Sequence, residues 1–193
     1  MATREISDAQ SPDFARALRS LHDARLRPEV RLTEVPAPTR LAPHAVAMTA
    51  DIVDPSDDED IATGRFVLLH DPDEPEPWGG PWRVVTFARA ELEAEVAGDP
   101  MLGAVGWSWL TDALADRDIE PVNLAGTVTH VVSESFADLE EREPDVEMEI
   151  RASWSPQDAS VGIHLQAWVE MLATVGGLPP LPAGVVALPG RRR

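Results

Sequence analysis

Residues 145–154 read DVEMEIRASW, and this stretch decides the fold class. Apolar side chains occupy the even positions from Val146 to Trp154, and polar or charged side chains occupy the odd positions from Asp145 to Ser153. A period of two puts these sets on opposite faces of a β-strand. A strand with one buried and one wet face is typical of an antiparallel sheet, so we expect such a sheet here.

Further strands are predicted where short apolar or alternating segments are bounded by glycine, proline or acidic residues. These segments are residues 29–35, 44–53, 65–70, 82–87 and 122–136. The acidic stretches 54–63, followed by Gly64, and 71–77 are expected to be exposed loops, and 138–144 a hairpin loop.

Three helical regions are predicted, over residues 12–27, 88–116 and 161–175, and the middle one is interrupted at Gly98-Asp99-Pro100 and restarts at residue 101. Ser11 and Ser160 are expected to cap the first and last of them. The proline at position 28 and the glycine pair at 176–177 are expected to end the same two helices. The first half of 101–116 is apolar on all sides, which predicts a central place in the core.

The resulting order is α-β-β-β-(β)-α-β-β-α, and it favours an α+β fold with helices packed on an antiparallel sheet. This order, and the acidic charge, is similar to type III secretion chaperones and YbjN-like proteins, with no shared motif. We expect a flexible N-terminus at 1–11, a single domain at 12–176 and a proline-rich extended tail at 177–193.

The chain of 193 residues contains no lysine, cysteine or tyrosine, which removes several kinds of chemistry. A Schiff base, a thiolate nucleophile and cysteine-ligated zinc all require these residues. The phosphate-binding motifs GxGxxG and GxxxxGK[ST] and the zinc motif HExxH are also missing from the sequence. We therefore expect no cofactor and no metal, and favour a protein that is not an enzyme.

Other candidate chemistry fits ordinary structural roles better. His70 precedes three nearby acids and is the best metal candidate, but it also fits the end of a strand before a loop. Ser108 lies in a predicted helix and lacks the second glycine of a nucleophile elbow. Glu147 and Glu149 could form a carboxylate pair, but the sequence shows no apolar pocket that would raise one pKa.

The formal net charge is −18, and residues 51–150 carry it with 26 acidic and five basic side chains. A negative field of this size repels phosphate backbones and anionic membranes, so we expect no nucleic acid and no membrane. A protein partner with a basic surface would be attracted. No apolar run reaches the roughly 18 residues of a membrane span, and the polar first ten residues do not resemble a signal peptide, so we expect a cytoplasmic protein.

The segment Trp78-Gly79-Gly80-Pro81-Trp82 is the most distinctive in the chain, and Arg83 follows it directly. Two indoles on one loop could form a binding platform, since tryptophan is enriched at interaction hot spots. Arg83 could then hold an anion. Trp78, Trp82 and Arg83 are our candidate binding residues, although both indoles could instead pack into the core.

This tryptophan segment, together with FARAL at 14–18, PEVRL at 28–32 and GWSWL at 106–110, resembles DUF3000, a family of uncharacterised actinobacterial proteins. The resemblance covers residues 12–175. It implies an actinobacterial origin, in agreement with a composition in which arginine supplies every basic side chain. It implies no activity, cofactor or catalytic residue.

Three functional hypotheses remain open. The first is a non-catalytic interaction or adaptor module that presents the acidic segments 51–76 and 138–149 to a protein partner, with the Trp78/Trp82 loop as a candidate additional contact. The second is a small-ligand-binding protein or enzyme with a pocket near the Trp78/Trp82 loop that contains Arg83 or His130. The third is a homo-oligomeric subunit whose C-terminal tail crosses to a neighbour.

Overall fold

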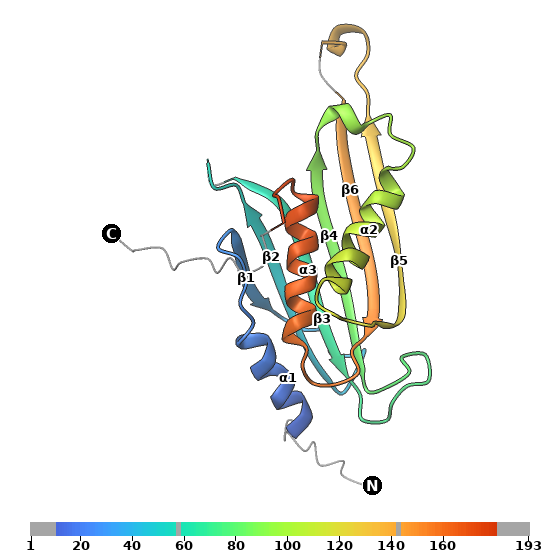
Figure 1. Cartoon of the computed structure of the whole chain (residues 1–193). Coiled ribbons are helices and arrows are strands. Elements are labelled where there is room, and N and C mark those ends of the chain that lie inside the picture. Colours follow the sequence, from blue (N-terminus) through green and yellow to red (C-terminus); the bar gives the residue numbers. More distant parts are fainter. Residues whose placement is uncertain (1–10, 57–58, 142–143, 181–193) are drawn as a thin grey trace, which may run out of the picture.

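The computed structural model describes residues 11–56, 59–141 and 144–180, and its centre is one antiparallel sheet (Figure 1). The six strands lie in the order β1-β2-β3-β4-β6-β5. The strands are β1 (Val30–Val35), β2 (His44–Val53), β3 (Asp60–His70), β4 (Trp82–Leu92), β5 (Val122–Ser133) and β6 (Asp145–Ser155). The helices are α1 (Pro12–His22), α2 (Leu102–Ala115) and α3 (Gly162–Val175), with 3-10 turns η1 (Ala94–Val96) and η2 (Ala137–Leu139). Most of the predicted N-terminal and C-terminal tails falls outside the described residues.

The predicted α+β class, antiparallel sheet and element order are confirmed. All three helices lie on one face of the sheet (Figure 1). The main hydrophobic cluster contains residues from each helix and from the sheet face beneath them. In β6 the alternation has the predicted effect, because Val146, Met148, Ile150 and Trp154 are fully buried. The opposite face of the sheet carries no helix in the described part of the chain.

Two predicted boundaries near the middle of the chain are wrong. The helix expected from Ala88 does not form, because β4 continues to Leu92 between β3 and β6, where Ala88 pairs with Ile150. Gly64 does not end a loop but lies inside β3. A Cβ at this position would come within 2.6 Å of Trp168 Cζ2 and 2.7 Å of the Phe87 carbonyl oxygen, so the crossing of α3 over the sheet requires glycine.

The helix ends also differ in part from the prediction. Helix α1 stops at His22, five residues before Arg27, and the chain then extends into β1. Neither Ser11 nor Ser160 caps a helix through its hydroxyl group. Instead, the Gly162 N–H at the start of α3 donates to the Ser20 hydroxyl of α1, 2.8 Å away, which joins the two helices.

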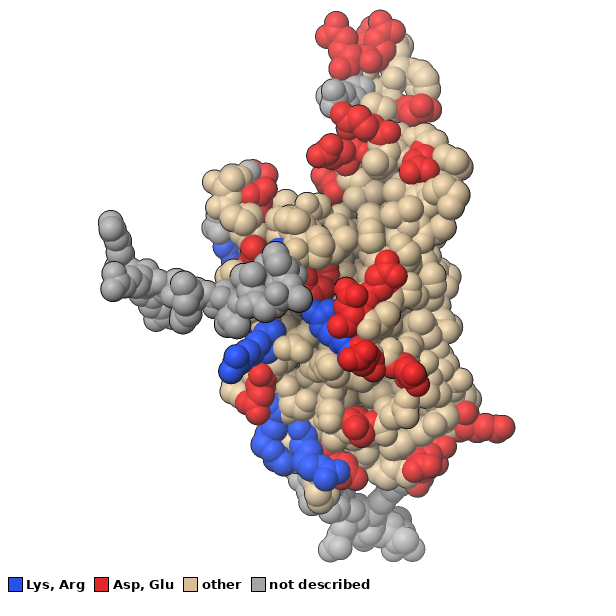
Figure 2. Space-filling model, in the orientation of Figure 1, with Lys and Arg blue, Asp and Glu red and all other residues tan. Residues whose placement is uncertain are grey.

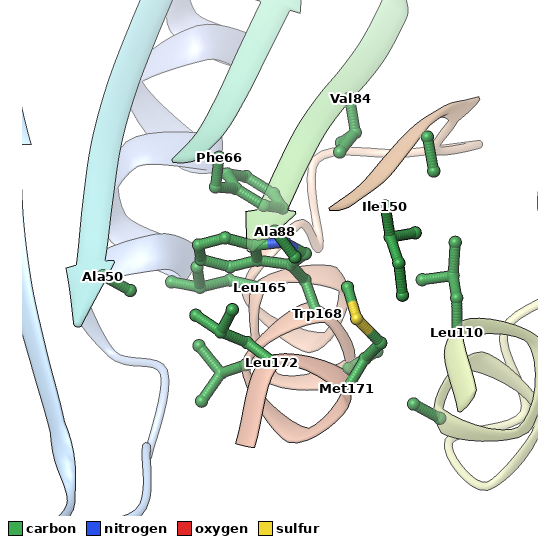
Figure 3. Close-up of a cluster of buried hydrophobic side chains, with 14 of the residues drawn as sticks. Ala50, Phe66, Val84, Ala88, Leu110, Ile150, Leu165, Trp168, Met171 and Leu172 are labelled. Carbon is green, nitrogen blue, oxygen red and sulfur yellow. The ribbon is translucent and has the colours of Figure 1, made fainter. Parts of the chain in front are cut away.

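Helix α3, and not α2, is the central helix of the core. Ten of the 14 residues of α3 are buried, against five of the 14 in α2. Trp168 of α3 lies at the middle of the cluster, with its ring centroid 5.7 Å from that of Phe66 (Figure 3). Helix α2 lies at the margin of the core, where Trp107 and Trp109 pack half-buried against the main cluster.

Among the described residues, no helix has both the length and the apolar character that a membrane span requires.

Candidate binding face

The two tryptophans of the predicted platform lie on opposite faces of the sheet. Trp82 is the first residue of β4, is only 3% exposed and packs on His70 with ring centroids 4.2 Å apart. Trp78 lies in the connection before β4 and packs, half-buried, against a small cluster formed by Ala47, Val67 and Leu69 on the other face. The two indoles therefore cannot form a shared platform, and Trp82 is not available to a partner.

Arg83 points to the face without helices and braces three strands. Its Nη2 donates to the Ser153 hydroxyl at 2.6 Å, and its Nη1 donates to the Ser155 hydroxyl at 3.2 Å and to the Asn123 carbonyl at 3.0 Å. Burial lowers the pKa of the Arg83 guanidinium. These contacts tie β4 to β6 and to the start of β5, so the guanidinium is already engaged within the fold.

The open face of the sheet carries an ordered row of side chains that crosses all six strands. Each residue of the row lies directly opposite the next one on the neighbouring strand, so the side chains of the row share one face. At the centre of the row, Phe87 of β4 lies between Arg65 of β3 and Arg151 of β6. The complete row is Thr33, Thr49, Arg65, Phe87, Arg151 and Thr127.

The central part of this row lines a shallow depression of about 600 Å³. The Arg151 guanidinium carbon lies 5.2 Å from the centroid of the Phe87 ring, a cation–π contact. Arg151 also forms an ion pair with Glu149 at 2.6 Å, and Arg65 Nη2 donates to the Pro36 carbonyl at 3.1 Å. Each arginine thus keeps further N–H groups for a ligand. We call Arg65, Phe87 and Arg151 the arginine row.

The neighbouring positions give the depression one apolar side and one charged side. The next row toward Trp78 contains Val35, Ala47, Val67, Val85, Ser153 and Ala125. On the other side, Arg89 lies opposite Glu149 of β6 and forms an ion pair with the neighbouring Glu147. Among the described residues, the lining of the depression includes no histidine or carboxylate.

Two of the five histidines, His70 and His164, are buried in the core, whereas His22 and His130 are exposed. His164 is buried and its Nδ1 accepts a hydrogen bond of 2.9 Å from Trp154 Nε1. Burial lowers the pKa of His164 to about 4. His70, the predicted metal candidate, stacks with His44, and burial lowers its pKa. The described residues contain no group of three or more histidines and carboxylates placed to hold a metal ion.

Three acidic segments that are distant in the sequence meet at one end of the sheet. They are the β2–β3 connection, the end of β4 with η1, and the β5–β6 hairpin, and the strand registers place them together. Figure 2 shows acidic side chains gathered at this end. The β3–β4 connection, with Asp71, Asp73, Glu74 and Glu76, lies at the opposite end. The arginine row is thus a local positive area between two acidic ends.

The fold and the face together define an α+β protein with a half-covered antiparallel sheet and a cationic, aromatic depression on its open side. The chain belongs to DUF3000, a family described as proteins of unknown function, whose model matches residues 10–186. No curated protein and no solved structure matches it. The similarity to chaperone folds stays a prediction.

The sequence reasoning missed Arg65, Phe87 and Arg151 as candidate site residues. They are 22 and 64 residues apart along the chain and belong to no motif. Alternation in each strand could have assigned every one of them to the polar face. Only the strand order and register bring the three together.

Proposed function

We propose that this protein is a non-catalytic protein-interaction module whose open sheet face is the docking surface. The partner is a protein segment that carries a carboxylate next to an apolar side chain, on a surface that is otherwise basic. The arginine row is the single observation that carries this proposal. It places two guanidinium groups on either side of an aromatic ring on an uncovered sheet.

The charges support this choice of partner. Neighbouring strands are about 4.8 Å apart, so the backbones of Arg65 and Arg151 are separated by roughly 10 Å. A carboxylate can accept charge-assisted hydrogen bonds from either guanidinium while an adjacent apolar side chain packs on Phe87 and Val85. The acidic ends of the sheet attract the basic surroundings of the segment and raise its association rate.

A small anionic ligand is the second candidate, because a depression of about 600 Å³ falls within the usual range of ligand sites. This alternative moves the site from the Trp78/Trp82 loop to the arginine row. Arg83 then acts as a brace for Ser153, not as the anion clamp. The predicted role of the C-terminal tail in an oligomer concerns residues outside the described part of the chain.

The experiment is site-specific photocrosslinking, which a cysteine-free chain allows without background labelling. Val85→Cys places a benzophenone maleimide label in the depression, and Ile163→Cys places the same label on the helix side. These positions are closely matched, since Val85 is 39% exposed and Ile163 is 37% exposed. Each labelled protein is added to extract from native cells, and the adducts are identified by mass spectrometry.

We expect one protein adduct from the label at position 85 and none of that protein from position 163. The substitutions Arg65→Gln/Arg151→Gln should reduce this adduct at least tenfold, equivalent to about 1.4 kcal/mol of binding. The control pair Arg16→Gln/Arg19→Gln removes the same charge from exposed positions of α1, on the helix side of the sheet, and should retain the adduct. An adduct that persists without Arg65 and Arg151 would refute the proposed surface. Native mass spectrometry of the purified protein tests the small-ligand alternative.

A further inference from the structure

The two edges of the sheet differ sharply in how they are protected. An open edge strand exposes unpaired backbone N–H and C=O groups, and natural proteins protect such edges with charges, proline or short length. Strand β1 follows this rule: it has six residues, it carries Arg31 and Glu34, and Pro36 follows it directly. Its edge is therefore unsuited to further strand pairing.

Strand β5 lacks these protections. It has 12 residues, VNLAGTVTHVVS, with no proline and no Asp, Glu, Lys or Arg, in a chain whose charged fraction is 26%. In the described structure it pairs with β6 alone. A register shift between Val122 and Ala125 disturbs only its start, and nine consecutive residues from Ala125 to Ser133 pair regularly. Val131 is 51% exposed.

Helix α2 extends this uncharged surface on the helix side. Trp107 lies against β5, because a Cβ on Gly126 would come within 2.5 Å of Trp107 Cζ3. Gly103, Trp107 and Thr111 are four residues apart and form one stripe on this side of α2. The helix contains a single charged residue, Asp112. Figure 2 shows a broad area of uncharged side chains along the outer side of the molecule, over β5 and the adjoining part of α2, with acidic side chains at its margins.

We propose that β5 pairs with β5 of a second copy of this chain, antiparallel across a two-fold axis near Val128, so that two sheets become one. Electrostatics favours a second copy here. Two molecules of net charge −18 repel each other, and the uncharged strand keeps acidic side chains out of the centre of such an interface, since the flanking Glu120 and Glu134 lie beyond the two ends of β5. A two-fold interface is self-complementary, which a single uncharged edge satisfies.

The side chains of β5 match each other in this register. Thr127 lies opposite Thr129 of the second copy, and Ala125 opposite Val131, so that small residues face larger ones. Val128 meets its own equivalent at the axis. In this register residues 125–131 of the two copies pair within the regular part of β5, which would cover roughly 24 Å of open strand edge at about 3.4 Å per residue.

The test is the mass in solution, measured by sedimentation equilibrium over a range of concentrations. The wild type should reach twice the monomer mass of 21.0 kDa. In Thr127→Glu/Thr129→Glu, glutamates of the two copies face each other, and the dimer dissociation constant should rise at least tenfold.

The matched control is Thr127→Glu/Thr129→Arg, which differs only in the second substitution. Each glutamate now faces an arginine of the second copy, and within the chain positions 127 and 129 lie opposite Arg151 and Glu149. Its dissociation constant should stay within threefold of the wild-type value. A wild-type monomer at every concentration would overturn the proposal. So would a dimer that survives both pairs of substitutions, or one that both pairs disrupt.

Discussion

Replacing Arg27 should destabilise the fold far more than replacing a surface arginine, and the loss should shrink in acid. The Arg27 side chain is only 2% exposed. Its Nε donates to Glu29 at 3.1 Å, and its Nη1 donates to Glu170 of α3 at 3.5 Å and to the Pro179 carbonyl at 3.3 Å. The guanidinium thus joins the start of β1 to α3 and to the segment that follows it.

The size of the loss in the free energy of unfolding follows from the two carboxylates that the substitution leaves without Arg27. In Arg27→Met, the apolar stem is replaced, but Glu29 and Glu170 stay largely buried without their shared cation. Breaking a buried ion pair from one side costs about 3–5 kcal/mol. Because these carboxylates keep some solvent contact, we expect the lower end, about 3 kcal/mol. For a chain of this size that lowers the melting temperature by roughly 6–12 °C.

The way in which this loss of stability changes with pH is a sharper test of the role of Arg27. Burial raises the pKa of Glu29, but hydrogen bonds from Arg27 and the backbone, with the charge of Arg27, outweigh burial and leave the pKa below its usual value of 4.5. In the wild type, Glu29 therefore contributes stability above its unfolded pKa, and this contribution is lost as the pH falls through the folded pKa. Without Arg27, only the backbone hydrogen bond opposes the effect of burial, so the pKa of Glu29 is higher than in the wild type and protonation at low pH relieves part of the loss.

Urea unfolding of the wild type and Arg27→Met at pH 7 and near pH 4 measures both effects. Arg16→Met is the control, because Arg16 is 64% exposed and its ion pair with Asp13 should contribute well under about 1 kcal/mol. Equal losses in Arg27→Met and Arg16→Met would contradict the reasoning. A loss in Arg27→Met that grows on acidification would also contradict it.

Two further perturbations test the core. Burial lowers the pKa of His164 to about 4 in the folded state, from its ordinary value of 6.5. Between these two pH values the unfolded state binds more protons than the folded state. The free energy of unfolding therefore falls as the pH drops from about 6.5 to about 4. This histidine should account for about 3 kcal/mol of that loss, and His164→Gln should flatten the pH profile of urea unfolding accordingly. Gly64→Ala should cost about 1–3 kcal/mol, because its methyl group would overlap Trp168 and the Phe87 carbonyl, whereas Gly80→Ala, with open space around it, should be nearly neutral in thermal melts. A neutral Gly64→Ala would mean that α3 can move away from the sheet at little cost.

The bounds of strands with regular alternation could be predicted well. The bounds of strands interrupted by small residues could not. β2 and β6 carry regular alternation, and the predicted ranges match the structure to within a residue. β3 and β4 extend beyond their predicted bounds at Gly64 and Ala88, where glycine and alanine give little periodic signal. In both places the small residue makes room for α3. This need arises only when the helix packs on the sheet, so the local sequence does not reveal it.

The candidate site depended on the fold in the same way. Trp78 and Trp82 are prominent in the sequence, but strand alternation and the β3–β4 pairing send their side chains to opposite faces. Arg65, Phe87 and Arg151 are unremarkable in the sequence and adjacent in the sheet. The missing charges of β5 were visible from the start, yet they became informative only when β5 proved to be an edge strand.

The sequence by itself determined the α+β class, the element order, the face of β6 that is buried and the segments that carry the acidic charge, because each depends on local periodicity and composition. Only the tertiary structure decided which strand lies at an edge, which helix is central and which side chains meet across the sheet. These follow from strand order and register, which join residues far apart in the chain and leave no local pattern.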